Sequence, residues 1–212
     1  MSQDLQIHQA RLDISQTEYD RLWALLSEDE RSRANKFKHE HLQRNFVAAR
    51  GNLRAILAQY LACEPNQILF SYGDRGKPYV ENVYFNLAHS QNLAIYAVCG
   101  DREVGIDLEY IDFKVDVNAI AKRYFLRSEQ EFIKNLSDRA NYVAKYLAFY
   151  RAWTLKEAYG KATGQGLANI LNSLDISSLL ELPIGETLQI NGWKLQSLNT
   201  QSDYCAALCV CL

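Results

Sequence analysis

Two carboxylates lie two residues apart in the segment Val104–Tyr110, whose branched and aromatic side chains are typical of a β-strand. Side chains two positions apart on a strand share a face, so we expect Asp107 and Glu109 to project together. Neighbouring carboxylates repel each other unless a cation lies between them, and their hard oxygens suit Mg²⁺. The alternative is a half-exposed strand with one polar face.

A third carboxylate, Glu157, lies on the apolar side of a predicted helix. Apolar residues recur there at steps of three and four, at Val143, Tyr146, Tyr150 and Trp153. Glu157 and then Lys161 continue that line, and burying two charges without partners would be costly. The pattern therefore favours a functional site over a solvated i,i+4 ion pair, which remains the alternative. Lys156 lies about 100° around the helix from Glu157, so we expect it to be solvated or to face a phosphate.

Basic residues beside predicted turns are candidates for binding a phosphate. Arg75 and Lys77 flank Gly76, with Pro78 following, and His89 and Ser90 begin a predicted turn. Cationic side chains and free backbone amides in such turns can hold a phosphate. The GxxxxGK[ST] pattern of a Walker loop is absent, and His89 can equally be an ordinary turn histidine.

A basic run extends from Arg31 to Arg54 and includes Arg44 and Arg50. We expect most of it to be solvated helix surface, from which one or two residues could reach a phosphate.

The elements that would carry these residues follow the order strand, helices, strands, helices, strands. The predicted strands are 5–14, 84–87, 93–99, 104–110 and two or three within 188–212. One predicted helix ends at residue 26, and the others span 41–62, 117–135 and 139–163. Ser15 or Thr17 can cap the first helix, and Asn191-Gly192 predicts a hairpin turn. Two similarly ordered halves thus meet near Gly100. This predicts an α+β fold of two related subdomains, 1–100 and 101–212, with a cleft between them.

The composition excludes several classes of protein. The chain has 212 residues and a formal net charge of −2, which argues against a protein that coats nucleic acid. It contains no run of about 18 apolar residues, so no membrane span is expected. We therefore expect a cytoplasmic protein.

The chain resembles the Sfp-type phosphopantetheinyl transferases over roughly residues 28–167, because its motifs occur together in the order and approximate spacing of that family. The matching segments are Gly76-Lys77-Pro78, Phe85-Asn86-Leu87-Ala88-His89-Ser90, Gly105-Ile106-Asp107-Leu108-Glu109 and Trp153-Thr154-Leu155-Lys156-Glu157-Ala158-Tyr159-Gly160-Lys161.

The resemblance implies an enzyme that transfers the 4'-phosphopantetheine arm of coenzyme A to a serine of an apo acyl, peptidyl or polyketide carrier protein, with adenosine 3',5'-bisphosphate as the other product. It implies a monomer of two α+β subdomains related by a pseudo-twofold axis. Residues 1–100 would contact the coenzyme A nucleotide, and residues 101–212 would carry the metal carboxylates and the catalytic helix.

The family's functional residues match positions in this chain. Asp107, Glu109 and Glu157 correspond to the ligands of Mg²⁺, for which Mn²⁺ is the alternative. Glu157 would also be the general base, and Lys161 would contact the phosphates, with Asp107 as the third catalytic residue. The other expected coenzyme A contacts are His89 at the ribose 3'-phosphate, Lys77 in the loop around the adenine nucleotide, and Arg44 or Arg50, Arg75, Pro78, Ser90 and Lys156.

An acidic carrier protein would need a basic surface beside the site. Lys114, Lys122, Arg123 and Arg127 follow the acidic strand and could supply it, or they could be ordinary helix surface. Two other functions compete with the transferase: a nucleotide-binding module without transferase activity, and a different Mg²⁺-dependent phosphotransferase.

Overall fold

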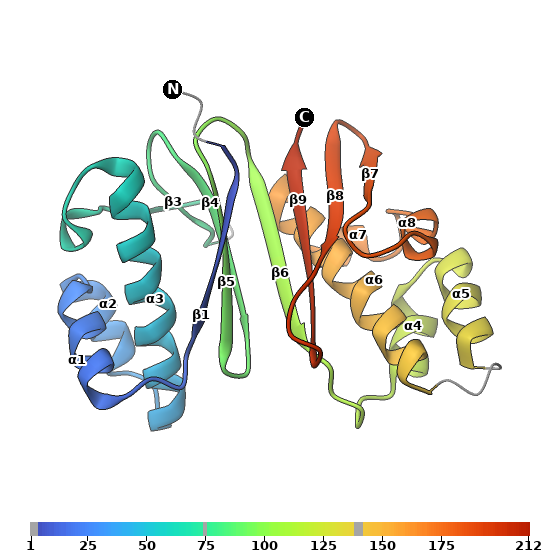
Figure 1. Cartoon of the computed structure of the whole chain (residues 1–212), viewed down its shortest axis with the longest axis horizontal. Coiled ribbons are helices and arrows are strands. Elements are labelled where there is room, and N and C mark those ends of the chain that lie inside the picture. Colours follow the sequence, from blue (N-terminus) through green and yellow to red (C-terminus); the bar gives the residue numbers. More distant parts are fainter. Residues whose placement is uncertain (1–3, 74–75, 138–141) are drawn as a thin grey trace. The chain divides into compact units, whose positions relative to one another are not determined.

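Each half of the chain packs a 22-residue helix against an antiparallel sheet (Figure 1), so the predicted α+β fold class is confirmed. The computed structural model describes residues 4–73, 76–137 and 142–212, and the chain divides into two units, Met1–Asp101 and Arg102–Leu212. Within the described ranges, no helix combines the length and apolar character needed to cross a membrane.

The first unit contains a three-stranded sheet in the order β1-β5-β4 and a two-stranded hairpin, β2-β3. Its elements are β1 (Gln6–Arg11), α1 (Gln16–Leu25), α2 (Glu28–Ala34), α3 (Glu40–Leu61), the 3-10 helix η1 (Pro65–Gln67), β2 (Ser71–Tyr72), β3 (Pro78–Tyr79), β4 (Tyr84–Ser90) and β5 (Leu93–Cys99).

Local sequence signals explain the long helix and its neighbours. The Ser15 hydroxyl accepts a hydrogen bond from the Glu18 amide at 3.2 Å and caps α1, as predicted. The helix α3 begins and ends one residue before the predicted 41–62. Its apolar side packs Val47, Leu53 and Leu57 into the core of the unit against β4 and β5.

The predicted turn at His89 and Ser90 is wrong. Both residues belong to β4 and pair with Ala94 and Leu93 of β5. The turn is one step later, at Gln91, whose φ of 49° is the left-handed conformation that such a tight reversal requires.

Two residues of the basic run, Arg50 and Arg54, are buried, whereas the others are exposed or half-buried, as expected for most of it. The carboxylate of Glu30 accepts hydrogen bonds from Arg50 and, at 2.5 Å, from Arg54. Arg54 also donates to the carbonyls of Pro65 at 2.6 Å and Ile68 at 3.1 Å. The sequence pattern could not reveal these partners, because they lie on α2 and on the segment after α3.

The second unit contains a four-stranded sheet in the order β6-β9-β8-β7. Its elements are β6 (Val104–Tyr110), α4 (Val117–Tyr124), α5 (Arg127–Ser137), α6 (Tyr142–Thr163), α7 (Leu167–Ile170), α8 (Ser177–Glu181), β7 (Thr187–Ile190), β8 (Trp193–Leu198) and β9 (Tyr204–Cys211). The predicted helix 117–135 is two helices, because Glu129 caps a new start by accepting from the Leu126 amide at 3.0 Å.

The two units share one strand order. In each, the first strand pairs with the last, and the last pairs with the next to last: β1-β5-β4 and β6-β9-β8, with β7 added at the edge of the second sheet. Each unit also places its 22-residue helix, α3 or α6, between the first strand and the final pair in the sequence. The repeated order supports the two related subdomains expected from the sequence.

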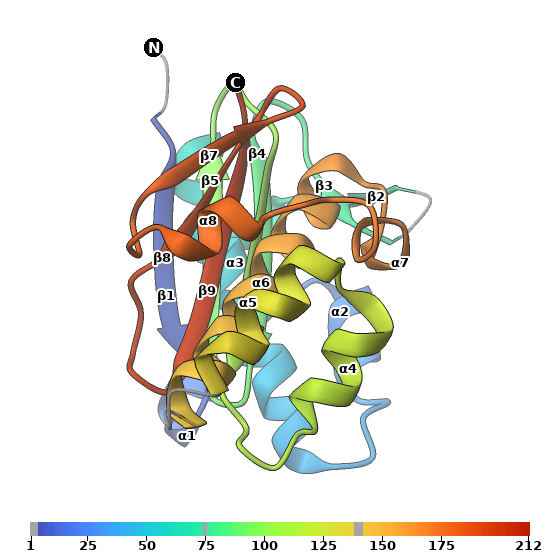
Figure 2. The same ribbon diagram turned by 90° about the vertical axis from the view of Figure 1, so that its right-hand side faces the viewer.

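The helix α6 is buried on almost every side. Its sheet-facing side contacts β6 and β9, while α4, α5, α7 and α8 pack around the rest (Figure 2). The expected apolar stripe is buried only in part: Tyr146 and Tyr150 belong to the core, but Val143 is 49% exposed, and Trp153, Glu157 and Lys161 are only half-buried. The half-burial of the line from Trp153 onward leaves the two charged side chains accessible.

We predict that Glu30→Gln destabilises the protein strongly, because it weakens the bonds to two buried guanidinium groups. Breaking such a pair costs about 3–5 kcal/mol of unfolding free energy, measurable by urea denaturation. The matched control is Glu18→Gln, since Glu18 pairs with Arg21 at 2.6 Å but its side chain is 37% exposed. This control should cost about 1 kcal/mol or less. Equal losses would contradict a special role for the buried cluster.

The stabilisation that Glu30 gives to the unchanged protein should depend on pH. Burial raises the pKa of Glu30, but hydrogen bonds and positive charge from Arg54 and Arg50 outweigh it, and the pKa lies below the ordinary value of 4.5. The unfolded chain therefore binds the proton more readily. The stabilisation by Glu30 should be complete above about pH 4.5 and should be lost as the pH falls through the lower pKa of the folded state.

Candidate active site

One face of β6 lies directly on the backbone of α6. A Cβ atom on Gly105 would lie 2.2 Å from the Ala158 carbonyl oxygen and 2.4 Å from the Ala162 amide nitrogen, so only glycine fits there. Asp107 is two residues further along the strand and shares this face. The absent side chain thus brings Asp107 against the C-terminal half of α6.

The carboxylate of Asp107 is buried against Lys161. The Lys161 ammonium donates to Oδ1 at 2.6 Å, and Asp107 is 4% exposed. Burial raises the pKa of Asp107, and the charge and hydrogen bond of Lys161 offset only part of that rise. The other oxygen, Oδ2, is buried without a hydrogen-bond partner among the described residues.

Glu157 belongs to the same electrostatic group. Burial raises the pKa of its carboxyl, the negative charge of Asp107 raises it further, and Lys161 lowers it in part. The structure therefore brings together the predicted residues Asp107, Glu157 and Lys161. Two carboxyl groups thus lie near one ammonium, and the pKa of each is raised.

Glu109 follows Asp107 on the same face of β6 and is half-buried. Its negative charge acts on Tyr150 of α6, where it contributes to the raised pKa of the phenol. Within the described ranges, no three His, Cys, Asp or Glu side chains gather closely enough to hold a metal ion. The assignment of all three carboxylates as ligands stays a prediction.

The donor set nevertheless fits a hard divalent cation. The buried Asp107 Oδ2 has no hydrogen-bond partner among the described residues, and burial raises the pKa of both carboxyl groups by more than Lys161 lowers it. Oxygen atoms with these properties are the ligands that Mg²⁺ and Mn²⁺ prefer. Asp107 and Glu157 would therefore be the first contacts of such an ion.

The predicted phosphate-binding residues of the first unit lie at the start of β3 and at the end of β4. Lys77 closes the loop between β2 and β3, where its carbonyl accepts from the Gly73 amide at 3.0 Å, and Pro78 begins β3. His89 is exposed and Ser90 half-buried at the end of β4. Arg75 lies outside the described residues.

The two upstream arginines differ in accessibility. Arg44 is half-buried; its guanidinium donates to the Ile14 carbonyl at 2.7 Å and lies 4.9 Å from the centre of the Tyr19 ring. Arg50 is buried, and besides Glu30 it binds the Tyr72 hydroxyl at 2.8 Å. Arg50 thus serves the packing of the first unit, contrary to the predicted contact with coenzyme A.

Comparison with known proteins identifies the family. The model described as the 4'-phosphopantetheinyl transferase superfamily matches residues 103–209, and that described as the N-terminal part of a 4'-phosphopantetheinyl transferase matches residues 13–100. The 4'-phosphopantetheinyl transferase HetI of Nostoc sp. is 43% identical over 176 residues, which cover 80% of this chain and 73% of HetI. The chain belongs to the 4'-phosphopantetheinyl transferase superfamily. The resemblance and the enzyme class predicted from the sequence are confirmed.

More distant relatives of this transferase are also named as phosphopantetheinyl transferases. The 4'-phosphopantetheinyl transferase Sfp of Bacillus subtilis is 27% identical over 168 residues, covering 77% of this chain and 71% of Sfp. The human L-aminoadipate-semialdehyde dehydrogenase-phosphopantetheinyl transferase is 30% identical over 172 residues, covering 74% of this chain and 55% of its own length.

One predicted site residue of the transferase has a different environment from that expected. Lys156 is fully buried and forms an ion pair with Glu129 at 2.9 Å, so the solvated position predicted for it is wrong. The error has a physical cause: α4, α5 and α7 cover the side of α6 that would otherwise face water. Glu129 itself was missed, because the residue at the N-cap is Leu126 and not one of the short polar residues that mark a capping box in a sequence.

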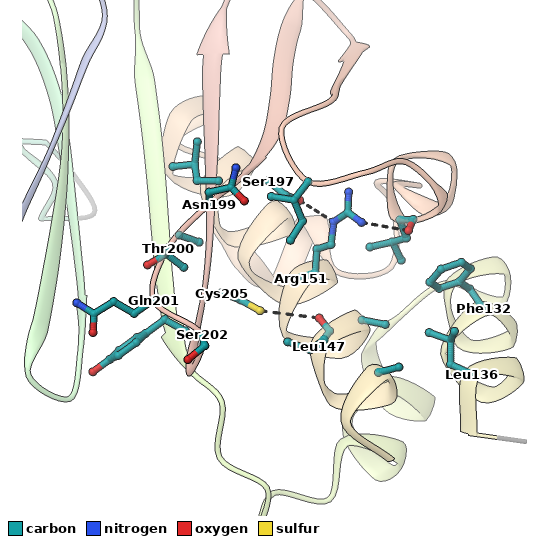
Figure 3. Close-up of a pocket in the computed structure, with 17 residues that line it drawn as sticks. Phe132, Leu136, Leu147, Arg151, Ser197, Asn199, Thr200, Gln201, Ser202 and Cys205 are labelled. Carbon is teal, nitrogen blue, oxygen red and sulfur yellow. Dashed lines mark hydrogen bonds between the residues drawn. The ribbon is translucent and has the colours of Figure 1, made fainter. Parts of the chain in front are cut away.

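A cavity of about 330 Å³ lies elsewhere in the second unit, between the N-terminal half of α6 and the loop from β8 to β9 (Figure 3). Phe132, Leu136 and Leu147 supply apolar side chains to the lining, and Arg151 lies between Ser197 and the side chains of α5. None of the predicted site residues is among the described residues that line it.

We predict that Gly105→Ala disrupts the site of the transferase. The new methyl group would meet main-chain atoms of α6 that cannot move aside alone, and such overpacking costs about 1–3 kcal/mol or more. The matched control is Gly160→Ala in α6, where the nearest atoms to a new Cβ are at 3.5 Å. It should be neutral or stabilising by up to about 1 kcal/mol.

Thermal unfolding and transferase turnover would be measured for both variants. We expect a lower unfolding temperature and reduced turnover for Gly105→Ala alone. Equal behaviour of the two variants would contradict the close approach of β6 to α6.

Proposed function

We propose that this transferase moves the 4'-phosphopantetheine arm of coenzyme A to a serine hydroxyl of an apo carrier protein, with adenosine 3',5'-bisphosphate as the other product. The named activity of its relatives supports the reaction class. The observation that carries the assignment of residues is the group formed by Asp107, Glu157 and Lys161.

The acidic residues would provide the metal site. Asp107, Glu109 and Glu157 would hold Mg²⁺, or Mn²⁺ in its place, which would neutralise charge on the diphosphate of coenzyme A. Asp107 is suited to this role because one oxygen already faces Lys161 and the other has no partner among the described residues.

Lys161 and Glu157 would act on the reacting groups. The Lys161 ammonium would donate to a phosphate oxygen and stabilise the charge that develops there. The Glu157 carboxylate would accept the serine proton. The serine oxygen forms a bond to the β-phosphorus, and the bond from that phosphorus to the leaving nucleotide phosphate breaks.

The first unit would supply contacts to the nucleotide. We assign His89 to the ribose 3'-phosphate, Lys77 and Pro78 to the loop around the adenine nucleotide, and Ser90 to the phosphate beside His89. Exposure of His89 at the end of β4 supports this assignment. Arg44 and Arg75 remain predicted contacts, whereas the burial of Arg50 and Lys156 removes them from the proposal.

An acidic carrier protein would bind a basic surface on α4 and α5. Lys122 and Arg123 occupy the last turn of α4. A cavity of about 490 Å³ is lined by Lys122, Arg127 and Lys134, together with Glu131, which pairs with Arg127 at 2.9 Å. Positive charge there complements the acidic surface expected of carrier proteins. The identity of the carrier would follow from a panel of apo acyl, peptidyl and polyketide carriers.

We predict that Asp107→Ala and Glu157→Ala abolish transfer while the protein stays folded. Purified protein would be incubated with coenzyme A, Mg²⁺ and the carrier panel, and the mass of each carrier measured. The unchanged protein should add one phosphopantetheine arm, and loss of the base alone should lower the rate by about 10²–10⁴. Glu186→Ala, at an exposed position, is the control. Full turnover by either site variant would remove that residue from the mechanism.

We predict that His89→Ala raises the KM for coenzyme A but not for dephospho-coenzyme A, which lacks the 3'-phosphate. The variant loses an interaction made only to that group, so kcat should change little. Steady-state kinetics with both substrates would test this. Equal losses with the two substrates would place His89 elsewhere.

A further inference from the structure

A buried ion pair joins α6 to two other segments of the second unit. Lys156 and Glu129 are both fully buried, and their side chains meet at 2.9 Å. The ammonium also donates to the carbonyls of Leu171 at 2.9 Å and Leu174 at 2.5 Å. All three of its donors are therefore used, and none remains for a ligand.

The carboxylate of the pair is equally well satisfied. Besides Lys156, Glu129 accepts from the Ile176 amide at 3.1 Å and from the Leu126 amide at 3.0 Å. The pair thus ties together the start of α5, the segment from Leu171 to Ile176, and α6. Rotation of α6 about its axis would break these bonds and leave a buried charge unpaired, which would be costly.

The direction of these bonds around α6 is informative. Each helical residue advances by about 100°, so Glu157 and Lys161 lie about 100° and 140° from Lys156. Ala158 and Ala162, which touch β6 at Gly105, lie about 200° and 240° from Lys156. The helix is therefore held on two opposite sides, and Glu157 and Lys161 lie between the two contacts.

The first unit contains the same arrangement. Arg54 is the fifteenth residue of α3, which begins at Glu40, and Lys156 is the fifteenth of α6, which begins at Tyr142. Arg54 pairs with Glu30, which is the third residue of α2, as Glu129 is of α5.

The remaining bonds also correspond. Glu30 accepts from the Ser27 amide, as Glu129 does from Leu126. Arg54 also binds two carbonyls after its helix, as Lys156 does. A device repeated in both units at the same helix position belongs to the packing of the long helix and not to coenzyme A.

A second anchor supports the N-terminal half of α6. Arg151 donates to the Ser197 hydroxyl at 2.7 Å and to the carbonyls of Leu179 at 2.7 Å and Leu180 at 3.2 Å (Figure 3). Its partners lie on β8 and α8. The ion pair of Lys156 is therefore the buried anchor that lies nearest to Glu157 and Lys161 along the helix.

We propose that the Glu129–Lys156 ion pair is a positioning device that fixes the rotation of α6 and so holds Glu157 and Lys161 toward Asp107. Lys156 is then a positioning residue and not a coenzyme A ligand. The inference rests on the proposed roles of Glu157 and Lys161. Replacement of a buried pair by apolar residues is often neutral for stability, so a fixed geometry is the benefit that an ion pair can add.

The test compares Glu129→Gln and Lys156→Met with a variant that destabilises the same unit without touching the pair. Leu195→Ala is that control, since Leu195 is a fully buried core residue of β8. Activity would be measured with coenzyme A, Mg²⁺ and a carrier protein, at a temperature where circular dichroism shows each variant folded. Glu129→Gln is the milder change and does not alter α6 itself.

We expect both pair variants to lower kcat at least tenfold per folded molecule, with the KM for coenzyme A within threefold of the unchanged protein. Leu195→Ala should lose a similar amount of thermal stability and keep its kcat. If Lys156→Met raised that KM tenfold while Glu129→Gln behaved as the unchanged protein, Lys156 would be a coenzyme A contact and the inference would be overturned.

Three further outcomes are decisive. Unchanged kcat in both pair variants would reduce the ion pair to a source of stability, which also overturns the inference. Glu157→Ala and the unchanged protein belong in the same series. Full activity of Glu157→Ala would remove Glu157 from the mechanism and with it the purpose of the positioning device, whereas absence of transfer by the unchanged protein would refute the proposed function itself.

Discussion

The close approach of β6 to α6 at Gly105 is the constraint on which the site depends. Main-chain atoms of the helix occupy the space where any other residue would place its Cβ. Asp107 follows on the same face and is buried, so Lys161 can reach it at 2.6 Å. Glu157 is drawn into the same charged group, and its pKa responds to burial first and to Asp107 second.

The degree to which buried charges are satisfied separates architecture from chemistry in this protein. Glu129 and Lys156 bond to each other and to backbone groups of two other segments, and the Glu30 carboxylate binds two arginines. Among the described residues, Asp107 pairs with one cation, Lys161, and its Oδ2 atom has no hydrogen-bond partner. The unsatisfied group is the one able to bind a further charged ligand.

The sequence indicates local relations well and distant ones poorly. The shared face of Asp107 and Glu109 follows from strand alternation, and the limits of α3 follow from helical periodicity within one residue. The burial of Lys156 and Arg50 could not be predicted in this way, because their acidic partners lie on other helices. The apolar stripe that leads to Glu157 was predicted correctly at Tyr146 and Tyr150, which are buried, but its continuation through Trp153 and Glu157 is only half-buried.

The internal repeat explains why Glu157 lies beside a buried cation. In both units, the fifteenth residue of the long helix is fixed by a glutamate of the preceding helix and by carbonyls that follow. The next residue is Ala55 in the first unit and Glu157 in the second. A side chain adjacent to a fixed point on a helix has a well-defined direction, because little backbone movement can accumulate over one residue. The first unit uses this rigidity for packing alone, whereas in the second the same rigidity is available to a carboxylate that must meet Asp107 across the strand.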